Sequence, residues 1–145
     1  MGGRRSRLAP GARMIVVDTT VWADWFSGAR TPEGDRLDQA PSAHEAGLTR
    51  PILTEVLQGF RADADFERAR AWLVRLPVLE LDVDGHVAAA LLFRRLRRRG
   101  ITVRGAVDCI VAQTCIMADA QLLTGDREFE AIARHAPLRL CAVKR

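Results

Sequence analysis

Four acidic residues stand where apolar stretches give way to a turn or to the start of a helix. They are Asp18, Glu55, Asp108 and Asp126. Asp18 closes the apolar run at 14–17, and Asp126 follows a second apolar run that ends in a glycine turn. In a parallel α/β sheet the carboxyl ends of neighbouring strands meet along one edge, where ligands bind. We therefore expect these carboxylates to gather at that edge.

Four anions held close together repel one another unless a cation lies between them. Carboxylates without accompanying thiolate or imidazole groups suit hard cations that prefer oxygen, so the set predicts a site for Mg²⁺ or Mn²⁺. Such an ion lowers the pKa of a bound water and stabilises a leaving oxygen. The sequence therefore indicates metal-dependent phosphate chemistry.

Each acid also has a purely structural interpretation. Asp18 and Asp126 can cap helices, Asp108 can be a first-turn acid favoured by the helix dipole, and Glu55 can lie on a solvated helix face. Two details favour the functional interpretation. Glu55 borders an apolar stripe, and Asp108 begins a helix that is too apolar to have a solvated face.

The elements that must position these acids alternate along the chain. Strands are predicted at residues 14–18, 47–49, 78–81, 121–124 and 138–143. Helices are predicted from a Thr19 or Thr20 cap to Gly28, then at 31–42, 51–60, 65–76, 87–99 with Asp84 as its cap, 106–120 and 126–135. Strands that alternate with helices predict a three-layer α/β/α sandwich with a central parallel sheet.

Charge and length divide the chain into a short leader and one domain. All of the net charge of +4 comes from the four arginines in residues 1–13, which we expect to form a disordered basic extension. Residues 14–145 are formally neutral, so the high isoelectric point is weak evidence for nucleic-acid binding. No apolar run is long enough to span a membrane, and Cys109, Cys115 and Cys141 fit reduced core thiols, so we expect a cytoplasmic protein.

The acidic motifs resemble those of a known family. The matching segments are residues 15–21 (IVVDTTV), 54–56 (TEV), 107–112 (VDCIVA) and 123–129 (LTGDREF). In this order, across a chain of this length, they resemble the PIN-domain ribonucleases, and specifically the VapC-like toxins of bacterial toxin–antitoxin pairs. The resemblance covers residues 14–145, which we therefore expect to form a PIN-like nuclease domain. One departure is Gly125, where many relatives carry a polar or basic residue.

The resemblance implies an endoribonuclease that depends on Mg²⁺ or Mn²⁺ and has the PIN-like fold. It implies that Asp18, Asp108 and Asp126 bind the metal directly, and that Glu55 does so directly or through water. Three threonines would support the site by holding a water or a phosphate oxygen: Thr20, Thr19 and Thr124. The resemblance further implies a cognate antitoxin, bound in a groove that the first helix and the helix after Glu55 help to form, and a homodimer.

Basic and aromatic residues mark further surfaces. A run of arginines at 94–99 and Arg104, four residues before Asp108, can form a rim that captures RNA phosphates or simply a solvated helix end. We take Arg104, Arg98 and Arg99 as the candidate RNA contacts. Trp22, Trp25 and Phe26 lie at helical spacing, and at least one of them is expected in the core.

Three alternatives use a similar fold. A phosphoacceptor receiver domain needs a well-placed lysine, which Lys144 at the far end of the chain does not provide. An RNA-processing nuclease without an antitoxin is the more serious rival. A domain that only binds RNA is disfavoured because all four acids are present. No histidine lies in any motif, which disfavours a histidine-based ribonuclease that uses the 2′-hydroxyl.

Overall fold

A four-stranded parallel sheet lies at the centre of the molecule. The computed structural model describes residues 13–39 and 45–145. Its strands are β1 (Ile15–Val17), β2 (Ala46–Gly47), β3 (Gln121–Leu123) and β4 (Arg139–Leu140). They pair in the order β2-β1-β3-β4, and every pair is parallel.

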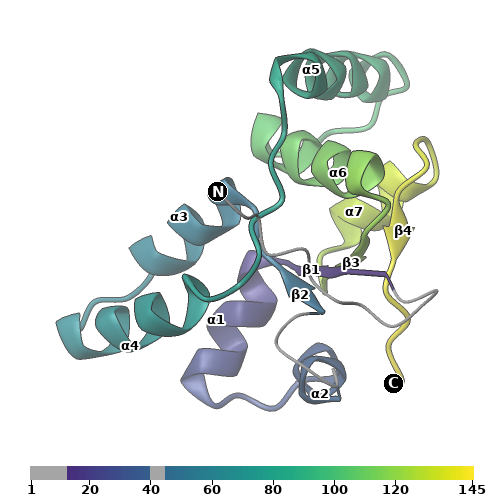
Figure 1. The fold of residues 1–145 in the computed structure, drawn as a ribbon. Helices are drawn as coiled ribbons and strands as arrows, with labels where there is room; N and C mark the ends of the chain where they lie inside the picture. The colour runs from purple at the N-terminus through teal and green to yellow at the C-terminus, as the bar shows by residue number, and fades with distance from the viewer. Residues whose placement is uncertain (1–12, 40–44) are drawn as a thin grey trace.

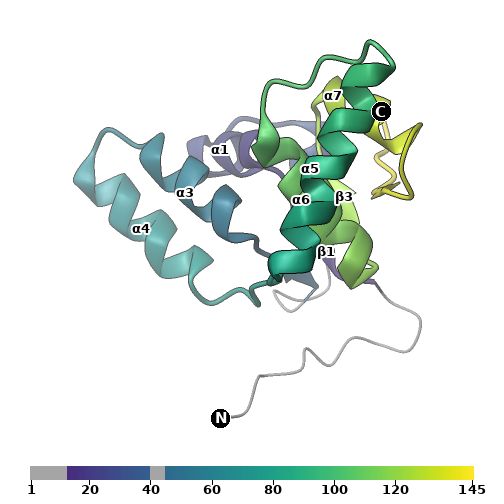
Figure 2. The same cartoon turned by 90° about the horizontal axis from the view of Figure 1, so that it is seen from above.

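Helices cover the sheet on both sides. They are α1 (Thr19–Ser27), α2 (Pro32–Asp38), α3 (Arg50–Gln58), α4 (Asp63–Leu73), α5 (Val83–Arg98), α6 (Ala106–Ala118) and α7 (Arg127–Ala133). Figure 1 shows α5 and α6 above the sheet and α1 and α2 below it. From above, α5 runs along α6, and α3 lies beside α4 (Figure 2). The predicted α/β/α sandwich is confirmed.

The core forms between the two inner strands and α6. Val16, Val17, Leu122 and Leu123 are completely buried. The apolar helix α6 is central, because it contacts α3, α5, α7 and β3. Its cysteines, and Cys141, are buried free thiols, as predicted. Among the described residues, no helix is long and apolar enough to cross a membrane.

The strand predicted at residues 78–81 was wrong. Only Val78 pairs with the sheet, through an isolated bridge to Leu48. The reason lies in the partner segment, because Thr49 already caps α3 and accepts from the Ile52 N–H at 3.3 Å. Beyond β2, only Leu48 pairs with this segment before the chain enters α3 at Arg50.

Two predicted helix caps were also wrong. Asp82, not Asp84, caps α5, since its carboxylate accepts a 2.7 Å hydrogen bond from the Gly85 N–H. Asp18 itself, rather than a threonine, caps α1. The helix predicted at 31–42 ends at Asp38, and residues 40–42 lie outside the described residues. The predicted extension at 1–13 lies outside them too, apart from Arg13.

Candidate active site

Strand register brings Asp18 and Thr124 together at the carboxyl edge of the sheet. Val17 is paired with Leu123, and the Asp18 N–H donates to the Leu123 carbonyl at 2.9 Å. The next residue on each strand therefore faces the other. The Thr124 hydroxyl donates to Asp18 Oδ2 at 2.8 Å, while the Thr19 N–H donates to Oδ1 at 2.8 Å. Both oxygens of this buried carboxylate are thus held in place.

Asp126 is positioned by the same threonine and by its own helix. The Asp126 N–H donates to Thr124 Oγ1 at 3.0 Å, which fixes the turn after β3. Its Oδ1 accepts from the Glu128 N–H at 2.9 Å and so caps α7. The second oxygen, Oδ2, accepts from Arg104 Nη2 at 2.9 Å.

The other two acids come from two different helices. Glu55 lies on α3, and its Oε1 accepts a 3.5 Å hydrogen bond from the Thr19 hydroxyl. Asp108 lies in the first turn of α6, which has no side-chain cap at its N-terminus. Elements that are far apart in sequence therefore converge on one place.

These acids surround a single pocket of about 320 Å³. Its lining contains the four predicted acids, two of the three predicted threonines and Arg104: Asp18, Thr19, Thr20, Glu55, Arg104, Gly105, Val107, Asp108 and Asp126. Thr124 reaches the lining only through its bonds to Asp18 and Asp126. Arg98 and Arg99 are exposed at the end of α5 and are not part of this lining.

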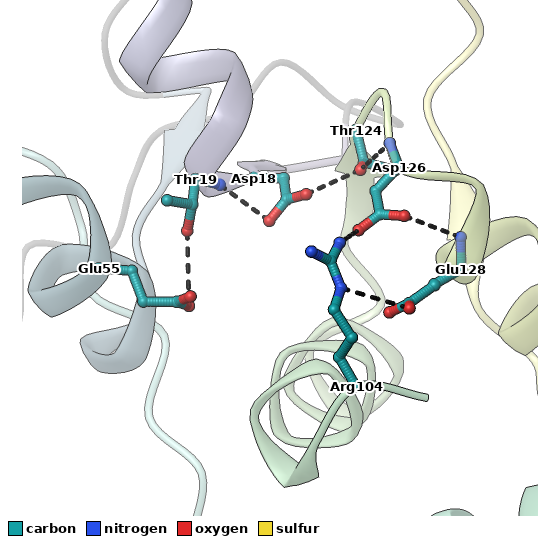
Figure 3. A network of polar contacts seen from close by, with 7 residues as sticks. All are labelled: Asp18, Thr19, Glu55, Arg104, Thr124, Asp126 and Glu128. Carbon is teal, nitrogen blue, oxygen red and sulfur yellow. Dashed lines mark hydrogen bonds and ion pairs between the residues drawn. The ribbon is translucent and has the colours of Figure 1, made fainter. Parts of the chain in front are cut away.

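A fifth acid, Glu128, belongs to the same network and was not singled out in the sequence. Figure 3 shows the Arg104 guanidinium between Asp126 and Glu128. Its Nη2 lies 2.9 Å from Asp126 Oδ2 and its Nε lies 3.3 Å from Glu128 Oε1. Glu128 Oε2 is buried without a hydrogen-bond partner. The available signal was its place two residues after Asp126, in the first turn of the same helix.

Burial and mutual repulsion raise the pKa values of three carboxyls. Burial raises the pKa of Asp18, partly offset by the Thr124 and Thr19 hydrogen bonds. Burial and then the charge of Asp18 raise the pKa of Glu55. For Asp108, burial followed by hydrogen bonding and repulsion with Glu128 raises the pKa to about 7.

The donor set fits a hard divalent cation. Every acidic group at the pocket offers carboxylate oxygens. Three of these acids have raised pKa values, which a bound cation would lower. Glu128 Oε2 is a further acceptor without a hydrogen-bond partner. Within residues 13–39 and 45–145, no three acidic, histidine or cysteine side chains converge closely enough to hold an ion directly. Mg²⁺ usually keeps several waters, which suits carboxylates that surround a pocket without meeting at one point.

The predicted aromatic residues lie elsewhere, on the side of α1 that faces α3 and α4. Trp22 is completely buried, which confirms the expected core residue. It stacks with Phe26 at a centroid distance of 5.9 Å, and Trp25 packs against Trp72 at 5.1 Å. Trp25, Phe26 and Trp72 are only partly buried. Part of this aromatic cluster is therefore accessible between α1 and α4.

Comparison with known families decides what kind of domain carries this site. Residues 15–135 match the PIN domain. The chain belongs to the PIN-domain family. The segment matched by this PIN domain begins in β1 and extends past α7, so it contains all four predicted acids and Glu128.

Two known ribonucleases are similar to this chain over nearly its whole length. The VapC ribonuclease Mb1587 of Mycobacterium bovis is 30% identical over 135 residues, which cover 90% of this chain and 100% of the relative. Ribonuclease VapC11 of Mycobacterium tuberculosis has the same identity and coverage.

Solved structures share the fold at low sequence identity. The crystal structure of VapBC2 from Rickettsia felis, bound to a DNA fragment from their promoter, superposes with a TM-score of 0.72 at 16% identity. It covers 90% of this chain and 99% of the other. VapC20 of Mycobacterium tuberculosis, a toxin that cleaves the sarcin-ricin loop, superposes with a TM-score of 0.63 at 19% identity. It covers 81% of this chain and 93% of the other.

Proposed function

We propose that this PIN domain is a metal-dependent endoribonuclease that cleaves RNA phosphodiester bonds as the toxin of a toxin–antitoxin pair. The observation that carries the proposal is the single pocket lined by Asp18, Glu55, Asp108 and Asp126, which come from four separate segments. The 30% identity to VapC ribonucleases over 90% of the chain supports the reaction class.

In this proposal Asp18, Asp108 and Asp126 hold the ion together with waters that it keeps, and Glu55 holds it directly or through water. When bound, Mg²⁺ or Mn²⁺ supplies an activated water and stabilises the leaving oxygen. The pocket lining in the described part of the chain contains no histidine, which agrees with a reaction that does not rely on imidazole as acid or base.

The remaining residues of the pocket orient these groups and the substrate. Thr124 fixes Asp18 and the Asp126 backbone with one hydroxyl, and Thr19 links Asp18 to Glu55. Thr20 is exposed in the lining, where its hydroxyl can donate to a phosphate oxygen. Arg104 at the pocket, with Arg98 and Arg99 beyond it, is proposed to bind the RNA backbone.

Two protein partners complete the proposal. The partly exposed aromatic side chains between α1 and α4 suit an antitoxin segment, which would cover apolar area that water otherwise contacts. A homodimer is proposed on the resemblance to VapC-like toxins. Because the proposed substrate is cellular RNA, we also propose a cytoplasmic location.

The proposal is tested with purified protein and total RNA. Cleavage is expected with Mg²⁺ or Mn²⁺ and is expected to stop with EDTA. Asp108→Asn should lower the rate by about 100-fold or more, because it removes charge from the site while keeping the shape of the side chain. Asp119→Asn is the matched control, since Asp119 is an exposed acid at the other end of α6. Undiminished cleavage in EDTA would overturn the metal mechanism.

The toxin role is tested separately from cleavage. Expression of the wild type alone should arrest growth, and co-expression of a small protein encoded directly upstream should restore it. A harmless nuclease that co-purifies with no small partner would instead favour an RNA-processing enzyme of the same fold.

A further inference from the structure

Arg104 lies at the mouth of the acidic pocket. Its guanidinium reaches Asp126 Oδ2 at 2.9 Å and Glu128 Oε1 at 3.3 Å. Among the residues that the structure describes, it is the only basic side chain in the pocket lining. Arg104 therefore supplies positive charge where the carboxylates need it (Figure 3).

The surroundings of Arg104 leave it free to move. It belongs to the connection between α5 and α6, and its side chain is 77% exposed, whereas those of Asp126 and Glu128 are only 19% and 25% exposed. Its position thus depends on the two carboxylates more than on packing. An ion pair with such an exposed partner contributes little stability, so other ions can displace the arginine.

We infer that Arg104, held by Asp126 and Glu128, is an internal counter-ion that competes with the divalent cation for Asp126, and that RNA removes this competition by drawing the guanidinium onto a phosphate. The inference rests on the proposed function, because it concerns the same pocket and the same substrate. A guanidinium can form bidentate hydrogen bonds with either a carboxylate or a phosphate, so a phosphate can replace the carboxylate partner of Arg104.

The exchange has a thermodynamic consequence. When Arg104 pairs with a phosphate, its ion pair with Asp126 breaks and the carboxylate can bind the metal. When the metal binds this carboxylate first, Arg104 can pair with a phosphate. Linkage requires the two effects to be equal, so RNA and metal bind cooperatively. The domain would then hold its metal weakly until substrate arrives.

The first experiment measures binding of Mn²⁺ alone to the full chain by calorimetry. Arg104→Gln is expected to tighten Mn²⁺ binding by about tenfold, which lies within the usual range of coupling between sites. Arg104→Lys, which keeps the charge, should stay near the wild type. Arg50→Gln is the matched control, because it removes an equally exposed arginine whose partner, Glu80, lies outside the pocket.

The second experiment repeats the titration with a saturating 2′-O-methyl oligoribonucleotide of mixed sequence, checked by electrophoresis to be intact afterwards. The wild type should bind Mn²⁺ more tightly with the oligonucleotide than without it, and Arg104→Gln should show no such gain. Unchanged or weaker Mn²⁺ binding by Arg104→Gln alone would overturn the inference, as would a gain that persists in this variant. Either result leaves the proposed function standing if the wild type binds Mn²⁺ and cleaves RNA. A wild type that binds no Mn²⁺ would overturn both.

Discussion

The Thr124 hydroxyl donates a 2.8 Å hydrogen bond to Asp18 Oδ2 across 106 residues of sequence. The same oxygen accepts from the Asp126 N–H at 3.0 Å. One side chain therefore positions two of the proposed metal ligands. It also lowers the pKa of Asp18, against the stronger opposing effect of burial.

Removal of this hydroxyl should impair cleavage without unfolding the domain. Thr124→Val keeps the volume but leaves Asp18 Oδ2 without its donor, so the pKa of Asp18 should rise further. We expect cleavage to fall by about 10- to 100-fold, as for other groups that orient metal ligands. The rate should also regain part of its loss at higher pH, where Asp18 is ionised. Thr124→Ser, which retains the hydroxyl, should keep most of the activity and the wild-type pH profile.

The metal-free protein should lose stability as the pH rises toward neutrality. The pKa of the Asp108 carboxyl is about 7 in the folded chain, against an ordinary value of 3.8 that we take for the unfolded chain. Between pH 3.8 and about pH 7 the folded chain therefore keeps a proton that the unfolded chain has released. Stability therefore falls with rising pH across this window. Asp108→Asn should reduce this slope, to which the raised pKa values of Asp18 and Glu55 also contribute, and should raise the melting temperature at pH 7 or leave it unchanged. Thermal melts in EDTA from pH 4 to pH 8 measure both effects, and a steeper fall in the variant would contradict the assignment.

Metal should stabilise the wild type more than the Asp108→Asn variant. An ion that binds only the folded state, at ten times its dissociation constant, adds about 1.4 kcal/mol to the free energy of unfolding. The Asn variant should lose most of this gain. Melts with EDTA and with millimolar Mg²⁺ test the prediction, and equal shifts in both proteins would remove Asp108 from the metal site.

Growth arrest by the proposed toxin should depend on the charge of Asp126. Asp126→Ala should relieve the arrest, but it also removes the α7 cap that Asp126 provides to the Glu128 N–H. Loss of such a cap costs about 1 kcal/mol. Asp126→Asn keeps an acceptor for that bond and should relieve the arrest equally. If only the alanine variant grows, lost stability rather than lost metal binding explains the effect.

Arg98 and Arg99 should contribute to RNA affinity through charge alone. The double variant to Gln should weaken binding of different RNA sequences to a similar extent. It should also reduce the salt dependence of binding by about one unit of slope for each phosphate that the protein no longer neutralises. Filter binding over a series of salt concentrations measures this slope. The double variant Arg68→Gln, Arg70→Gln is the control, because both residues lie on α4; an equal loss of affinity in the control would indicate a non-specific charge effect.

The parallel α/β sandwich and the acids at its edge could be predicted from patterns in the sequence. Short apolar runs at 14–17 and 122–123, bounded by turn residues, predict buried strands, and a polar residue that follows such a strand is expected at the sheet edge. The same local rules failed where a tertiary partner decides the outcome. Residues 78–81 have a strand pattern but find only Leu48 to pair with, since the chain turns into α3 at Thr49.

Tertiary structure alone decided which polar groups meet in the pocket. The bond from Thr124 to Asp18 depends on the β1–β3 register, and the contacts of Arg104 depend on how α6 approaches α7. Glu128 has the sequence context of an ordinary first-turn acid, and only the fold buries one of its oxygens beside Asp108 and Arg104. Pattern in a sequence reports burial and local geometry, whereas ion pairs and raised pKa values arise from distances between distant segments, which the packed chain alone defines.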